Sequence, residues 1–363
     1  MSVRFWSGLP AAERRVTWAE LFFDLVFVAA VAQVGAPLAE HYSFAGIGRY
    51  AFLLLVIWWA WNGYAVYATR FDADAGTQRV LTLAQMAAVI FMAANAEEGL
   101  DSASSAGFAA AYAVMRLILV GQYLRAATID AARRLALEHA IGYGIAALIW
   151  LTSALVEPPL RYACWGLALG LDVATAVFVA RHTRRLPPHA SHLPERFGLF
   201  TLILLGEAIV ATMKGIQSQP IWTPAAAATA FGGIGLIFFI WWAYFDAADA
   251  TAHRQVRSRR DARLFEAWNY AHLPLYLGLA LTGVGVEHAV RLGGAGALHG
   301  EERWVLTGAI ALACASLVVL GATRSHDRVS DVTPADGRHP STRRGLVRGA
   351  QRRTSTAGPE RSS

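Results

Sequence analysis

The chain contains little charge for its length. Of its 363 residues only 16% are Asp, Glu, Lys or Arg, whereas 55% are hydrophobic, and the mean hydropathy is +0.38. Soluble domains average about 25% charged and about 45–50% apolar residues, so a soluble single-domain enzyme is not expected. The same apolar content argues against a disordered or fibrous chain. A polytopic membrane protein is the class that remains.

Cysteine and lysine are also scarce. Cys164 and Cys314 are the two cysteines, and each lies inside an apolar run. This placement fits buried, inert thiols rather than a disulfide framework or a metal site. Lys214 is the single lysine, so arginine carries nearly all of the positive charge.

Recognised enzyme signatures are absent. The sequence contains no GxxxxGK[ST] phosphate loop, no HExxH zinc motif and no GxSxG nucleophile elbow, which argues against a known NTPase or hydrolase. It also has no Cys/His cluster with metal-ligand spacing. We therefore predict no catalytic residue, no metal site and no cofactor. A membrane enzyme of an unrecognised kind remains an alternative.

Apolar runs of membrane-spanning length dominate the sequence. A helix needs about 20 mostly apolar residues to cross the hydrocarbon, and ten segments qualify. The pattern therefore predicts an all-α transmembrane bundle of about ten helices. We expect the first segment to be a retained span, because Glu20 and Asp24 interrupt it and a signal peptide would not carry them. The predicted spans are 17–36, 46–68, 80–97, 106–124, 136–156, 160–180, 196–214, 224–246, 265–287 and 303–322.

Basic residues sort to one side of these spans. The N-terminus, the connections after the second, fourth, sixth and eighth spans, and the C-terminal tail together hold 26 of the 32 basic residues. The opposite side holds 5, and Arg116 alone lies within a span. Because cytoplasmic loops carry the excess of Lys and Arg, we expect both termini in the cytoplasm. The pI of about 9.6 then reflects topology and requires no nucleic-acid partner.

The two ends of the chain differ from the span region 17–322. Residues 1–16 are expected to form a short cytoplasmic N-terminus. Residues 323–363 are rich in Arg, Ser, Thr, Pro and Gly and poor in large apolar side chains, which predicts a disordered basic tail on the cytoplasmic side. Contact of this tail with anionic lipid is an alternative to a solvated segment without a role.

A short motif recurs in the second half of the chain. The sequence Ile-Trp-Trp-Ala occurs at 57–60 and again at 240–243. The same offset places Asp24 on Glu207 without a gap, so each half carries an acid at an equivalent position of an apolar span. Six spans separate the equivalents, which predicts two copies of equal orientation. Chance similarity between two Trp-rich helices is the alternative.

The predicted repeat is incomplete. Spans in 17–180 make one six-helix copy, whereas 196–322 holds two-thirds of a second. The missing pair would fall where the Arg/Ser/Pro-rich tail begins. A natural truncation and a reading-frame slip in the coding sequence would both produce this pattern.

Acidic residues inside spans are the first candidates for a site, since placing an Asp mid-helix costs about 2.5–3.5 kcal/mol. Glu20 and Asp24 are four residues apart and share a face of the first span, with Glu20 near the cytoplasmic end, where we expect water to reach it. Glu207 lies in the middle of the seventh span. Asp24 and Glu207 would line one solute path by binding a cation or relaying protons. Pairing with arginine, as a packing device, is the alternative.

The candidate path is completed by Glu20, Arg116, Asp172 and His272. Arg116 needs an acidic partner, for which Asp24, Glu207 and Asp172 are the candidates, and a buried structural ion pair is the alternative role. His272 lies next to Pro274, where we expect the ninth helix to break, and broken helices often form transport sites. The amides of Asn62, Asn95, Gln85 and Gln122 are expected to make interhelical hydrogen bonds.

Three motifs resemble one known family. Glu20–Val28 reads ELFFDLVFV, Glu195–Phe200 reads ERFGLF, and Leu205–Glu207 reads LGE. With these motifs the chain resembles the bacterial low temperature requirement protein A family over residues 13–320. The resemblance implies a multi-pass protein of the bacterial inner membrane that is linked to growth at low temperature, with no assigned biochemical activity. The motif and repeat positions are Phe22, Phe23, Trp58, Trp59, Glu195, Arg196, Gly198, Gly206, Trp241 and Trp242.

A weaker similarity concerns mechanism. The sequence FFDLVF at 22–27 is similar to the Phe-Ser-Asp motif in the first helix of the endolysosomal and bacterial potassium channels built on six-helix units, whose first helices line the pore. Phe23 replaces the serine of that motif. We expect a channel or carrier for a small solute or cation along helices one and seven, in the lipid bilayer and with a homo-oligomer as an option. A membrane enzyme or a stress-related scaffold with structural acids is the alternative.

Overall fold

The computed structural model describes ten helices and a short β-ribbon. It covers residues 4–5, 16–40, 43–72, 75–96, 102–183, 191–219, 221–248, 258–293, 298 and 300–323. The predicted tail lies outside these residues except for Thr323, as does most of the predicted N-terminal segment. The helices are α1 Trp18–Glu40, α2 Phe44–Arg70, α3 Ala75–Ala94, α4 Ser102–Ala126, α5 Arg133–Ser153, α6 Leu160–Thr183, α7 His192–Gln217, α8 Pro224–Ala248, α9 Arg259–Leu292 and α10 Gly300–Ala322.

The ten predicted spans are confirmed as helices long and apolar enough to cross a membrane. The shortest, α3, has 20 residues, which at 1.5 Å per residue matches a hydrocarbon layer of about 30 Å. Large apolar side chains such as Phe231 and Phe239 are exposed on the bundle surface, as expected where lipid is the solvent. The chain is therefore a multi-span membrane protein.

Several helices begin or end a few residues from their predicted bounds, and the differences at α7 and α9 bear on the site. α7 begins at His192 rather than at Arg196, because the polar residues of its first turns bond to acids of α1 inside the bundle. α9 runs unbroken from Arg259 to Leu292 with Pro274 inside it, so the predicted break is wrong. Pro274 removes one backbone hydrogen bond, and close packing of α9 against α7 and α10 keeps the helix continuous.

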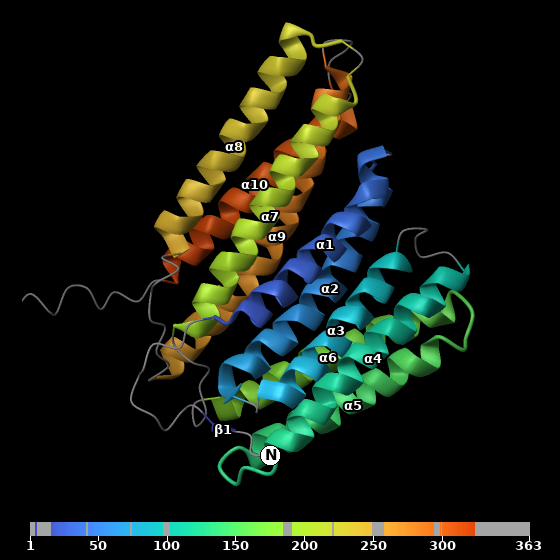
Figure 1. Ribbon diagram of the computed structural model, residues 1–363, viewed down its shortest axis with the longest axis vertical. Helices are drawn as coiled ribbons and strands as arrows, with labels where there is room; N and C mark the ends of the chain where they lie inside the picture. The colour runs from blue at the N-terminus through green and yellow to red at the C-terminus, as the bar shows by residue number, and fades with distance from the viewer. Residues whose placement is uncertain are drawn as a thin grey trace, which may run out of the picture. The chain divides into compact units, whose positions relative to one another are not determined.

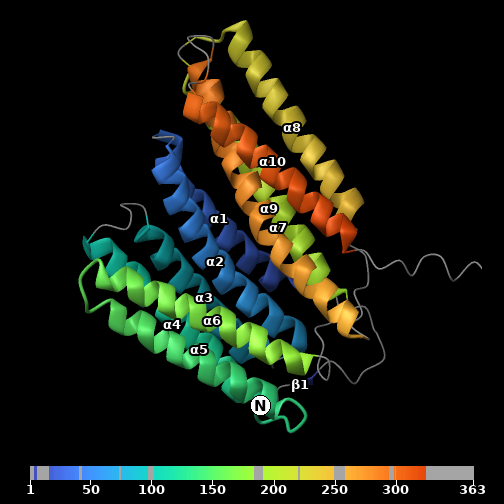
Figure 2. The same ribbon diagram turned by 180° about the vertical axis from the view of Figure 1, so that it is seen from behind.

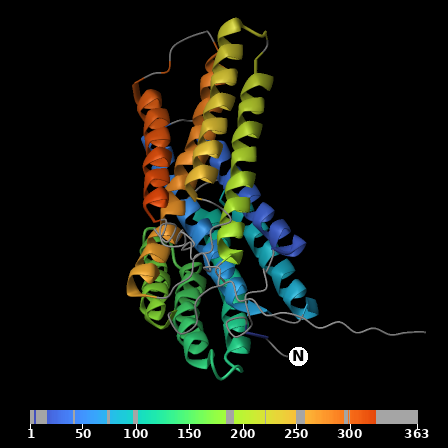
Figure 3. The ribbon, with the colours of Figure 1, turned by 90° about the vertical axis from the view of Figure 1, so that its left-hand side faces the viewer.

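α1, α2, α7 and α9 meet at the centre of the bundle. Figures 1 and 2 show α3–α6 on one side of this group and α8 with α10 on the other. In Figure 3, α8 faces the viewer between α7 and α10. Within the first six helices α1 packs on α2 and α3, and α3 packs on α4. Likewise, α7 packs on α8 and α9, and α9 packs on α10.

Small residues allow the central helices to approach closely. A Cβ atom on Gly278 of α9 would lie 2.8 Å from the Ala309 carbonyl oxygen of α10. One on Gly283 would lie 3.0 Å from Ala208 of α7. Close backbone contact of this kind is a main source of helix association in lipid, where no hydrophobic effect drives helices together.

A capping box lies at the start of α9, and a β-ribbon follows the end of α2. Ser258 accepts a hydrogen bond from the Asp261 amide while the Asp261 side chain accepts one from the Ser258 amide, a capping box at the start of α9. At the end of α2, β2 Phe71–Asp72 pairs antiparallel with β1 Arg4–Phe5. The ribbon therefore places Arg4–Phe5 at the end of the bundle where α2 ends.

Candidate functional site

A buried ion pair joins α1 to α7. Asp24 and Arg196 are both fully buried, and the two carboxylate oxygens of Asp24 accept hydrogen bonds from Nη2 and Nε of Arg196. Trp61 of α2 donates its indole N–H to Asp24 Oδ1 at 2.7 Å. A buried ion pair is tolerated only when such additional hydrogen bonds satisfy it. Asp24 therefore ties three helices together.

Aromatic rings surround the Arg196 guanidinium. Its central carbon lies 5.9 Å from the ring centroid of Phe23, 5.7 Å from that of Trp61 and 5.4 Å from that of Tyr64. Rings within about 6 Å stabilise a cation through their quadrupoles, most strongly where water is excluded. Arginine suits this place because its planar, weakly hydrated guanidinium can bond a carboxylate and pack against rings at once.

A second polar cluster lies one turn earlier on α1. Glu20 Oε2 accepts hydrogen bonds from the Thr17 amide and the Thr17 hydroxyl, both at 2.9 Å, and lies 3.3 Å from His192 Nε2. Glu20 is only 6% exposed, so the expectation that it is wet is wrong. The cause is α7, whose first turn covers it. Glu195 of that turn accepts the Val16 amide at 3.2 Å.

Arg116 pairs with Asp172, one of the three acids considered for it. Arg116 Nη2 of α4 lies 3.1 Å from Asp172 Oδ2 of α6, and both side chains are fully buried. The hydroxyl of Tyr112 donates to the same oxygen at 2.9 Å and accepts from Arg116 Nε at 3.0 Å. Gly63 of α2 makes room, since a Cβ there would lie 2.7 Å from Arg116 Nη1.

Glu207 lies in a different environment from Asp24. Its carboxylate is 3.7 Å from Lys214 Nζ, and both side chains are partly exposed. Glu207 faces a cavity of about 440 Å³, part of it open to the outside, between α1, α7 and α9. Asp24 does not line this cavity. We name it the α1–α7 cavity; its lining includes Val31, Gly35, Tyr50, Leu204, Glu207, Lys214, Gly283 and Glu287.

His272 is fully buried and bonded at both ring nitrogens. Nδ1 lies 2.8 Å from the Trp268 carbonyl oxygen, and Nε2 lies 3.2 Å from the Tyr244 hydroxyl. A carbonyl oxygen only accepts, so Nδ1 carries a proton and donates. These bonds join α9 to α8 near the ring of Phe197.

The predicted amide hydrogen bonds occur in part. Gln85 of α3 donates to Gln122 of α4 at 3.4 Å, as predicted. Asn95 instead donates to the Phe91 carbonyl of its own helix. Asn62 is buried, and its amide oxygen has no hydrogen-bond partner among the described residues.

The motif residues divide between the core and the surface. Phe23, Trp58, Trp59, Arg196 and Gly198 are buried, whereas Phe22 is 58% exposed. A Cβ on Gly206 would meet no atom within 4 Å. Trp241 and Trp242 are exposed although their counterparts in the predicted repeat, Trp58 and Trp59, are buried.

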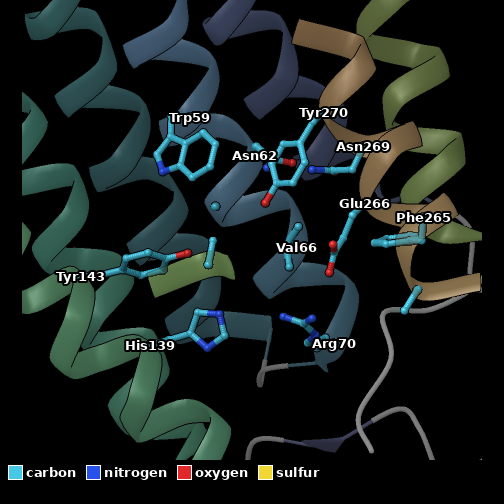
Figure 4. Close-up of a pocket in the computed structure, with 13 residues that line it drawn as sticks. Trp59, Asn62, Val66, Arg70, His139, Tyr143, Phe265, Glu266, Asn269 and Tyr270 are labelled. Carbon is cyan, nitrogen blue, oxygen red and sulfur yellow. The ribbon is translucent and has the colours of Figure 1, made fainter. Parts of the chain in front are cut away.

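A second cavity opens at the opposite end of the central helices. It holds about 700 Å³, part of it open to the outside, and lies between α2, α5, α6 and α9. Figure 4 shows its aromatic and polar side chains from both walls. We name it the α2–α9 cavity; its lining includes Trp59, Asn62, Val66, Arg70, His139, Tyr143, Phe265, Glu266, Asn269 and Tyr270. Within the described part of the chain, no group of three or more His, Cys, Asp or Glu residues is placed to hold a metal.

Several of these residues escaped the sequence reasoning. Arg196 was counted with the basic residues of the connection and placed at the first residue of the predicted span 196–214, whereas the structure places it in the second turn of α7. His192 lies before the predicted span 196–214, and Glu266 lies in the first turn of the predicted span 265–287. A charged side chain at such a position is ordinarily solvated. Their periodicity with later apolar residues is the one signal that could have found them.

Comparison with known proteins agrees with the sequence motifs. The model of the bacterial low temperature requirement A protein (LtrA) matches residues 15–335. An uncharacterised protein of Rhizobium meliloti (strain 1021) is 26% identical over 293 residues, which cover 77% of this chain and 70% of that protein. No solved structure matches the chain.

Proposed function

Since this multi-span membrane protein belongs to the bacterial low temperature requirement A family, we propose that it carries a small cation or another small solute across the membrane. The path would run between α1 and α7, with α2 and α9 completing its wall. The protein would lie in the bacterial inner membrane with both termini in the cytoplasm, because its basic residues sort to that side.

The acids of the α1–α7 cavity are the observation that carries this proposal. Glu207 of α7 and Glu287 of α9 both line it, and Lys214 is the basic residue there. Carboxylates facing a cavity inside a membrane bundle attract cations and commonly mark ion pathways. The partial exposure of Glu207 leaves it accessible to a solute.

The path is closed between the two cavities in this conformation. Along α9, Tyr270 lines the α2–α9 cavity, Ala280 lines the α1–α7 cavity, and Tyr276 lies between them. Tyr276 packs on Phe200, with ring centroids 4.9 Å apart, and Phe200 packs on Trp61 at 4.4 Å. Opening would require these rings to part, and we assign the adjacent Asp24–Arg196 pair the role of holding them closed.

The remaining predicted path residues fit supporting roles. Arg116, Asp172 and His272 are fully buried, and none of them lines the α1–α7 cavity. We propose that they fix α4, α6, α8 and α9 around the path. Glu20 would hold the first turn of α7 through His192.

The parallel repeat remains part of the proposal. The same pattern of helix contacts occurs in both halves. The contacts of α1 with α2 and α3, and of α3 with α4, correspond to those of α7 with α8 and α9, and of α9 with α10. This correspondence supports two copies of one helical unit.

Ion flux into proteoliposomes tests the proposal. We expect purified protein to conduct at least one of K⁺, Na⁺ and H⁺ above empty liposomes, and Glu207→Gln to lower that flux severalfold because it removes the cavity carboxylate. Glu301→Gln is the matched control, since Glu301 is exposed at the start of α10 and outside the cavity. Absence of flux for every ion with monodisperse protein contradicts a cation path.

A structural role for the acids is the second candidate. The Asp24 carboxylate accepts hydrogen bonds from Arg196 and Trp61. This arrangement favours a scaffold or a membrane enzyme in which the buried charges fix the packing of the helices. In that case Asp24→Asn would lower the unfolding temperature, while Glu207→Gln would change neither stability nor any activity.

A further inference from the structure

Two buried amide oxygens at the α2–α9 cavity accept no hydrogen bond from any residue that the structure describes. Asn62 is 7% exposed and Asn269 is 5% exposed, and the Oδ1 atom of each has no partner in the described part of the chain. Buried polar atoms in native proteins are almost always hydrogen-bonded. Because both residues line one cavity, a donor that occupies the cavity explains them together.

A carboxylate lies beside these amides. Glu266 is one turn before Asn269 and Tyr270 on α9 and lines the same cavity, and Figure 4 shows its carboxylate directed into the space between α9 and α2. It makes no ion pair with any residue that the structure describes. Two amide oxygens and a carboxylate are all acceptors, and an ammonium group, with three N–H donors and a positive charge, satisfies such a set.

A guanidinium lies at the same cavity. Arg70, the last residue of α2, is 5% exposed and lines the cavity. Figure 4 shows its side chain, like that of Glu266, among those that line the cavity. The fixed fork of a guanidinium suits a carboxylate ligand. Arg70 would repel a ligand that carries only a positive charge. Glu266 would repel a ligand that carries only a negative charge.

Aromatic side chains supply the apolar wall. The rings of Trp59 and Tyr270 are stacked, with centroids 5.9 Å apart and planes inclined by 5°. Ligand sites typically combine such apolar walls with a few convergent polar groups. The wall would cover the hydrocarbon part of a small ligand.

We propose that the α2–α9 cavity binds a small zwitterion of the α-amino acid class. Its ammonium group donates hydrogen bonds to Asn62, Asn269 and Glu266. Its carboxylate accepts hydrogen bonds from Arg70, and its side chain lies along Trp59 and Tyr270. The site concerns binding alone, so it holds whether or not the protein conducts ions between α1 and α7.

Calorimetric titration of the full-length protein in lipid nanodiscs tests the site. Each standard L-amino acid is titrated first. The tightest binder is then compared with the amine that lacks its carboxylate and the acid that lacks its ammonium group, for example isoamylamine and 4-methylpentanoate for L-leucine. We expect the amino acid to bind and both analogues to bind at least about tenfold more weakly, because each loses a charge-assisted contact.

Variants identify the cavity as the place of binding. Glu266→Gln and Asn269→Leu are expected to weaken binding of the amino acid at least about tenfold. Glu301→Gln is the control and should bind like the wild type. An amine that binds as tightly as its amino acid would overturn the zwitterion assignment. So would absence of binding by every amino acid to monodisperse protein, or unchanged affinity in Glu266→Gln.

Discussion

Asp24 and Arg196 show how one residue pair can define a membrane bundle at the residue scale. Both charges are removed from solvent, and their attraction together with the Trp61 hydrogen bond offsets the loss of hydration. The two residues are 172 positions apart in the sequence. The pair therefore fixes the position of α7 against α1, which local sequence preferences cannot determine.

Loss of one partner should therefore be more harmful than loss of both. We expect Arg196→Met to lower the free energy of unfolding by about 3–5 kcal/mol, because it leaves the Asp24 carboxylate buried without its cation. The double variant Asp24→Leu with Arg196→Met should recover a large part of this loss. Chemical denaturation of detergent-solubilised protein measures both changes.

An exposed arginine provides the control for this comparison. Arg133 begins α5 at the surface, and Arg133→Met should change stability by less than about 0.5 kcal/mol. A double variant that is less stable than Arg196→Met would contradict the assignment of the pair as a coupled unit.

Sequence reasoning identified these ionisable residues but not their partners. Asp24, Arg116 and Asp172 stand out because charge is rare inside apolar spans. The choice of Asp172 for Arg116 and of Arg196 for Asp24 depends on which helix faces meet, and that is decided by packing across the chain. Asn62 and Asn269 likewise became notable only when the structure placed both on one cavity.

At the scale of elements, glycine sets the distance between α9 and α10. A Cβ on Gly278 would lie 2.8 Å from both the carbonyl oxygen of Ala309 and the amide nitrogen of Ala313. These are backbone atoms, so no side-chain rotation relieves the contact and the two helices must move apart.

Gly278→Ala should destabilise the protein by about 1–3 kcal/mol through overpacking. Gly308→Ala is the matched control, because a Cβ on that α10 glycine meets no atom within 4 Å and alanine favours a helix. Thermal unfolding in one detergent compares the two. Equal midpoints for both variants would show that close approach at Gly278 is unimportant.

The number of helices followed from hydropathy, whereas several helix ends did not. Apolar runs of sufficient length predict spans reliably because lipid demands them. The starts of α7 and α9 were placed too late since His192 and Arg259 look like loop residues. Pro274 was given too much weight as a helix breaker, because α9 stays helical at that position, packed against neighbouring helices.

At the scale of the molecule, the sorting of charge predicts orientation. Asp130 lies in the connection between α4 and α5, at the basic end of the bundle, and Glu301 lies at the opposite end, in the first turn of α10. Both residues are exposed. In a variant without Cys164 and Cys314, each position can carry a single reporter cysteine.

A membrane-impermeant maleimide added to intact cells with a permeable outer membrane should label Glu301→Cys but not Asp130→Cys, since the excess of arginine marks the cytoplasmic side. Both should react after the cells are lysed. The reverse pattern would place the termini outside the cytoplasm.

The length of α9 has a consequence for how the two cavities behave together. Its 34 residues measure about 51 Å, well beyond a hydrocarbon layer of about 30 Å. Glu266 near one end lines the α2–α9 cavity, and Glu287 near the other lines the α1–α7 cavity. Between them Gly283 and Gly278 rest against α7 and α10. Because α9 lines both cavities and is held at these glycines, a tilt of this helix about them would change the width of both cavities.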